Sequence, residues 1–102
     1  MEPLPSTMFV KQETVCRRIV VVNMENGLHL VPCSRIAQTA SKFECAIQIT
    51  KDDNTVDAKN IFDLMTLNAV NGASLTIQAK GDGAEQLVAA LVNLFDTNFA
   101  EE

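Results

Sequence analysis

The hydrophobic positions of this chain follow two different periods, and the change from one period to the other predicts its elements. In residues 74–79 every second side chain is apolar, which is typical of a half-buried strand. In residues 84–95 apolar side chains recur every three or four positions, which predicts a helix with one buried face. The same comparison along the chain predicts strands over about residues 16–22, 45–50, 55–58 and 74–79, and helices over about residues 30–42, 60–67 and 84–95.

The predicted element order is β-α-β-β-α-β-α, which defines a fold class. Strands with one apolar and one polar face fit an antiparallel sheet that helices cover on one side only. We therefore expect an α+β fold of two layers, an open-faced β-sandwich. Residues 1–14 contain Pro3 and Pro5 and are expected to form a flexible N-terminal arm, and residues 15–102 are expected to form one domain.

Charge and cysteine content exclude several classes of function. The 102 residues include 13 acidic and 8 basic side chains, so the net charge of −5 argues against a general nucleic-acid binder. No apolar run approaches the roughly 20 residues of a membrane span. Cys16, Cys33 and Cys45 are odd in number and lack C-x-x-C spacing, which predicts neither a disulfide framework nor a zinc site. We expect buried thiols in a reducing cytoplasm, with Cys33 left open because it lies close to His29.

His29 is the only histidine, which excludes a metal site of several histidines. It stands between the Asn26-Gly27 turn and the first predicted helix, whose first turn contains Pro32. A helix start carries unpaired N–H groups and a partial positive charge, and both favour a bound anion. An imidazole beside such a site can hold a phosphoryl group. The alternative is a structural histidine that caps the helix or lies on the loop. We expect no metal and no cofactor.

The segment Gly27-Leu28-His29, with Pro32 three residues later, resembles the active-site segment of the HPr family. These are the histidine-containing phosphocarrier proteins of the bacterial phosphoenolpyruvate-dependent phosphotransferase system. Residues 59–65 (KNIFDLM) resemble the second signature of the family, and the resemblance spans about residues 15–95. It implies the HPr fold, with a four-stranded antiparallel sheet and three helices on one face.

The resemblance also implies a function. His29 would accept a phosphoryl group from enzyme I and pass it to an enzyme IIA-type component of a sugar transporter. The backbone N–H groups of Leu30 and Val31 would hold the phosphate. Such a protein is a cytoplasmic carrier and a substrate of phosphotransferases rather than an enzyme, and we expect a monomer.

Two positions depart from the family pattern. The family usually has an arginine where this chain has Val31, so a charged partner of the phosphate is missing. Arg35, one helical turn further on, is either a substitute charge partner or an ordinary surface arginine. Asn60 stands where some HPr proteins carry a regulatory serine, and it has no hydroxyl to phosphorylate. We expect Asn60 to cap the middle helix, which argues against regulation by HPr kinase.

HPr proteins bind their partners through a shallow apolar patch around the histidine, which Leu30, Val31, Phe62 and Met65 would form here. For Met65 a place in the core is an equal alternative. Three functions therefore remain open. They are a working phosphocarrier, a degenerate HPr-like regulatory protein with weak or no phosphotransfer because of Val31, and an interaction module without phosphate chemistry.

Overall fold

The elements follow the predicted order. The structure, a computed structural model, describes residues 14–100, so all of the predicted N-terminal arm except Thr14 lies outside the described residues. The strands are β1 (Val15–Val21), β2 (Ala46–Lys51), β3 (Asn54–Asp57) and β4 (Ser74–Lys80). The helices are α2 (Leu30–Ala40), α3 (Ile61–Met65) and α4 (Ala84–Asp96). The predicted order β-α-β-β-α-β-α is confirmed.

The four strands form one antiparallel sheet in the order β1-β4-β2-β3. β4 lies in the middle, where Ile77 pairs with Arg18 of β1 on one side and with Ile49 of β2 on the other. β2 and β3 form a hairpin, in which Ile49 pairs with Val56. The first and last strands are therefore neighbours, and β1 and β3 are the edges of the sheet.

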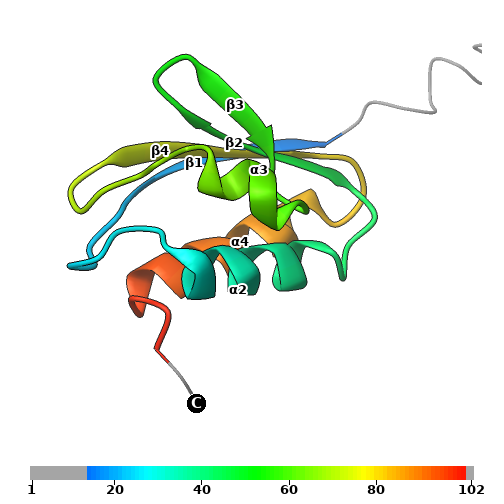
Figure 1. The fold of residues 1–102 in the computed structure, drawn as a ribbon. Helices are drawn as coiled ribbons and strands as arrows, with labels where there is room; N and C mark the ends of the chain where they lie inside the picture. Colours follow the sequence, from blue (N-terminus) through cyan, green and yellow to red (C-terminus); the bar gives the residue numbers. More distant parts are fainter. Residues whose placement is uncertain (1–13, 101–102) are drawn as a thin grey trace, which may run out of the picture.

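The helices cover one face of the sheet, as Figure 1 shows for α2 and α4, which run side by side beneath it. Alternate strand residues such as Ile47, Ile49 and Ile77 point into this layer and are buried, whereas their neighbours are more exposed. Ile36 of α2 and Leu91 of α4 are fully buried on the helix side. Burial of these side chains is the main favourable term in folding. The predicted two-layer open-faced sandwich is confirmed.

Two helices are shorter than the periodicity predicts. α2 ends at Ala40 rather than Lys42, because Lys42 N–H donates to the Thr39 carbonyl in a tighter closing turn. Phe43, which extends the apolar pattern, packs against the core from the loop. α3 ends at Met65, and Leu67 is buried in the turn that follows it. In both cases the apolar periodicity extends past the last helical residue, because an apolar residue in the following turn also contacts the core.

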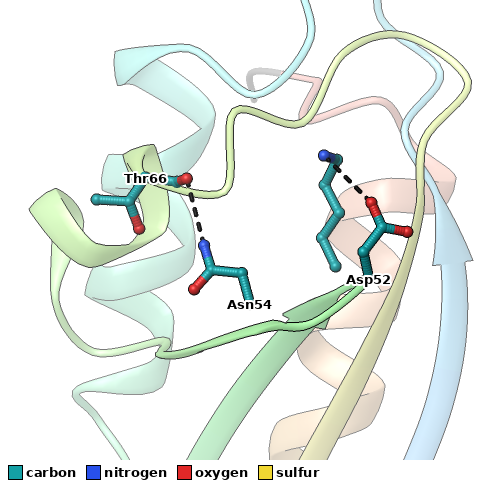
Figure 2. A network of polar contacts seen from close by, with 4 residues as sticks. Asp52, Asn54 and Thr66 are labelled. Atoms are coloured by element: carbon teal, nitrogen blue, oxygen red, sulfur yellow. Dashed lines mark hydrogen bonds and ion pairs between the residues drawn. The ribbon is translucent and has the colours of Figure 1, made fainter.

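A polar contact ties the β2–β3 hairpin to α3 (Figure 2). The Asn54 side-chain amide donates to the Thr66 carbonyl over 3.3 Å, at the end of α3. In the hairpin turn, Lys51 and Asp52 form an ion pair at 3.7 Å. The hairpin thus holds the short α3 beside the sheet, and α3 in turn carries Phe62.

Candidate functional site

The loop that leads to His29 is fixed by a close backbone crossing. Gly27 has a positive φ of 67°, and a Cβ at this position would lie 2.5 Å from the Ala69 carbonyl oxygen. The next residue, Leu28, donates its N–H to that same oxygen over 2.9 Å and buries its side chain. Only glycine fits here, on grounds of both φ and space. The crossing therefore determines where residue 29 begins the helix.

His29 is the N-cap residue of α2, between the Asn26-Gly27 turn and the helix. Its backbone is extended (φ −87°, ψ −165°), and its carbonyl accepts from Cys33 N–H over 3.2 Å. The side chain is exposed and makes no capping hydrogen bond. The imidazole therefore does not cap the helix and is accessible from solvent.

The first turn of α2 offers backbone donors beside this imidazole. The N–H groups of Leu30 and Val31 precede the first intrahelical hydrogen bond, and Pro32 has no N–H. No acidic side chain stands in this turn to compete for the two donors. The arrangement suits an anion on a residue at position 29.

Cys33 lies beneath this turn and has a structural role. Its thiol is buried and donates to the Leu28 carbonyl over 3.5 Å. Burial raises the pKa of the Cys33 thiol from 9.0 to about 11, so the thiol stays protonated at neutral pH and is not a nucleophile. Cys16 and Cys45 are also buried, so the prediction of buried thiols is confirmed.

Arg35 joins α2 to the C-terminal turn. Its Nη1 donates to the carbonyl oxygens of Phe99 and Ala100 over 3.1 and 3.2 Å. Phe99 is buried, and its ring meets Phe95 edge to face at 4.9 Å. Sequence reasoning missed this link because the partners lie at the far end of the chain. The structure thus places Arg35 against backbone carbonyls.

A group of exposed apolar side chains, which we name the docking face, lies on the first turn of α2, on α3 and beside Gly27. Phe62 is 78% exposed and Met65 41%, both on α3, which packs against α2. Leu64 takes the core position of α3, so the core alternative for Met65 is wrong. Val70 extends the face, since its backbone lies beside Gly27. Sequence reasoning missed it, and the only signal was an apolar residue in a polar loop. The docking face consists of Leu30, Val31, Phe62, Met65 and Val70.

Asn60 is the N-cap residue of α3, as predicted. Its side-chain oxygen accepts from the N–H groups of Phe62 and Asp63 over 2.9 and 3.1 Å. This contact satisfies two of the unpaired donors at the helix start. The amide therefore has a structural role at the family's regulatory position.

Residues 14–100 contain neither a cluster of metal ligands nor a helix that could span a membrane. No group there brings together three or more His, Cys, Asp or Glu side chains that could hold a metal ion. No helix in the same range is long and apolar enough to cross a bilayer.

Comparisons with known proteins agree with this geometry. Residues 16–97 match the protein-family model described as PTS HPr component phosphorylation site. The chain is 38% identical to the phosphocarrier protein HPr of Vibrio cholerae over 77 residues, which cover 76% of this chain and 91% of that protein. It is 36% identical to the HPr of Haemophilus influenzae over 78 residues, which cover 76% and 92%.

Solved structures give the same result. The crystal structure of HPr-C-His from Thermoanaerobacter tengcongensis superposes with a TM-score of 0.81 at 36% identity, covering 85% of this chain and 98% of that chain. The HPr of Bacillus anthracis superposes with a TM-score of 0.75 at 34% identity, covering 79% and 96%. Sequence, fold and the placement of His29 at the start of α2 therefore agree, and the chain belongs to the HPr family of phosphocarrier proteins of the phosphotransferase system.

Proposed function

We propose that this protein is a cytoplasmic phosphocarrier in which His29 accepts a phosphoryl group from enzyme I and passes it to an enzyme IIA-type acceptor. The observation that carries the proposal is the exposed imidazole at the N-cap of α2, beside the backbone donors of Leu30 and Val31. As the bond between phosphorus and its donor atom on enzyme I breaks, phosphorus bonds to a ring nitrogen of His29, and the displaced donor stays on enzyme I. The phosphoryl oxygens accept from these N–H groups. Membership of the HPr family supports this role.

Partner docking is assigned to the docking face. Its five side chains are apolar and exposed, and they lie on the first turn of α2, on α3, which packs against α2, and beside Gly27. Phe62 is the main anchor because it is the most exposed of them. Phe62→Ser should weaken transfer at low partner concentration. Ile19→Ser is the matched control, since Ile19 is 70% exposed but lies on β1.

Val31 supports a second candidate function. A valine offers no charged donor, and loss of one charge-assisted hydrogen bond costs about 1.5–3 kcal/mol, or roughly one to two orders of magnitude in transfer rate. The second candidate is an HPr-like regulatory protein that binds the same partners and transfers phosphate weakly or not at all. Val31→Arg tests this cost, because it should raise the transfer rate if the missing charged donor limits transfer.

Arg35 is our candidate charge partner for the phosphoryl group. In that role its guanidinium exchanges the carbonyls of Phe99 and Ala100 for the phosphoryl oxygens, which are stronger acceptors. Arg35→Met should then speed hydrolysis of the phosphorylated protein. Arg17→Met is the control, since Arg17 is engaged with Gln78 on the sheet.

The direct test is incubation with enzyme I and labelled phosphoenolpyruvate, with the Vibrio cholerae HPr as a positive control. We expect acid-labile label on the wild type and none on His29→Ala. An unlabelled wild type, beside a labelled control HPr, rules out the carrier. Binding of enzyme I without labelling would then support the regulatory candidate. We do not propose regulation by HPr kinase at Asn60.

A further inference from the structure

An acidic side chain lies at the border of the docking face, in the loop that carries His29. Glu25 is exposed in the turn that the Gly27 N–H closes by donating to the Met24 carbonyl over 2.9 Å. The Val70 backbone lies beside Gly27, so the docking face meets the loop at this turn. The Glu25 carboxylate therefore adds negative charge where the docking face reaches the histidine loop.

The β2–β3 turn brings further carboxylates to another border of the docking face. The Asn54 amide donates to the Thr66 carbonyl over 3.3 Å, which places this turn beside the end of α3 (Figure 2). Lys51 forms an ion pair with Asp52 at 3.7 Å, so its charge is compensated within the turn. Asp53 is exposed and forms no ion pair within residues 14–100. The turn as a whole therefore carries net negative charge.

The elements that carry the docking face add no cation to balance these carboxylates. α3 contains Asp63 as its one charged residue, and the loop from α3 to β4 has none. The one cation of α2 is Arg35, which donates to the carbonyls of the C-terminal turn. Figure 1 shows the β1–α2 loop and the β2–β3 turn at one end of the molecule. The connections at the opposite end, or the strand end beside them, carry Lys42, Lys59 and Lys80.

We propose that the docking face binds a protein surface on which lysine or arginine side chains surround an apolar pocket. The apolar side chains of the docking face supply the area that is removed from water, with Phe62 in the pocket. The carboxylates of Glu25 and Asp53 determine the sign of the charge on the partner. This inference rests on the proposed function, because it describes the partner that docks at the same site.

Phosphorylation of His29 would increase the same preference. A phosphoryl group adds negative charge at the end of the molecule where these carboxylates lie, so the phosphorylated and the free protein favour the same sign of partner. An acidic partner surface would bring like charges together, which lowers both the association rate and the affinity. Attraction between opposite charges is strong at low ionic strength and weakens as salt is added. The salt dependence of binding therefore reports the sign of the partner's charge.

Calorimetric titration of the full chain with enzyme I from the same organism tests this sign. The double variant Glu25→Lys/Asp53→Lys should bind enzyme I at least about tenfold more weakly than the wild type at about 0.01 M salt. Salt at about 0.15 M shortens the Debye length from about 30 Å to about 8 Å, so the two affinities should then come closer together.

Glu44→Lys/Asp82→Lys is the matched control, and it should bind like the wild type. It changes the net charge by the same amount, but both residues lie in connections at the opposite end of the molecule. All four substituted positions are exposed and lie outside the helices and strands, so each double variant should keep the fold. Circular dichroism of the three proteins checks this.

Three results would overturn the proposal. They are tighter binding by Glu25→Lys/Asp53→Lys, equal affinities of that variant and its control, and no binding of enzyme I by the wild type. Labelling of His29 by phosphoenolpyruvate, measured on the same samples, tests the carrier function separately. Salt-sensitive binding without labelling would support the charge complementarity and refute the carrier, whereas labelling with charge-insensitive binding would do the reverse.

Discussion

Substitution of Gly27 by alanine tests how the histidine loop is held. Two terms oppose alanine here. The positive φ of 67° costs an L-residue about 1–2 kcal/mol. The added Cβ would lie 2.5 Å from the Ala69 carbonyl oxygen, so the backbone must separate and the Leu28–Ala69 hydrogen bond is strained or lost. That bond contributes about 0.5–1.5 kcal/mol. We expect Gly27→Ala to lower the free energy of unfolding by about 1.5–3.5 kcal/mol.

Gly72 provides the matched control. Its φ is +94°, further from the left-handed minimum than that of Gly27, yet a Cβ there meets nothing within 4 Å. Gly72→Ala therefore carries backbone strain alone, which we expect to cost about 1–2 kcal/mol. The difference between the two variants isolates the collision with Ala69.

Urea denaturation of both variants, followed by circular dichroism, measures this difference. For a domain of this size, 1 kcal/mol also lowers Tm by about 4–8 °C. Equal losses of stability in Gly27→Ala and Gly72→Ala would refute the crossing argument. Gly27→Ala should further reduce phosphorylation of His29, because the loop that places this residue has moved.

Three further predictions concern a cap, a thiol and a cation. Asn60→Ala should cost about 1 kcal/mol in urea denaturation, and Asn60→Ser should recover most of it, since serine also caps; equal losses would contradict the cap. The pKa of the Cys33 thiol is 9.0 in the unfolded state and about 11 in the folded state. Between pH 9 and 11 the unfolded state therefore loses this proton while the folded state keeps it, which favours unfolding. The contribution of the thiol to stability is complete below pH 9 and declines as the pH rises to 11. Cys33→Ala should remove that decline, as pH-dependent unfolding would show. Arg35→Met should cost about 1 kcal/mol and speed amide exchange around Phe99, and unchanged exchange would argue against the link.

The fold could be predicted from the sequence because apolar residues recur at every second position in the strands and at every third or fourth position in the helices. The alternation at Leu75, Ile77 and Ala79 and the spacing of Leu87 and Leu91 each allow a single interpretation. The ends of α2 and α3 were predicted two residues too far along the chain, because apolar side chains just past each helix also pack against the core. Nothing in a residue's own side chain distinguishes an apolar position in the last helical turn from one in the loop beyond.

The placement of the candidate site was also predictable where the cause is local. The Asn26-Gly27 turn and Pro32 locate the start of α2, and therefore the position of His29. Contacts between distant segments could not be predicted. The hydrogen bonds of Arg35 to Phe99, and the place of Val70 beside Gly27, depend on how the whole chain packs.

The strand order has a consequence for the route by which this chain folds. β4 is one of the two inner strands, yet it lies late in the sequence. β1 cannot pair until β4 has been made, since Val15 pairs with Lys80. Among the strands of residues 14–100, the β2–β3 hairpin is the pair that can close first during synthesis. The high sequence separation of the other pairings slows folding and leaves the apolar side of β1 unprotected until β4 emerges.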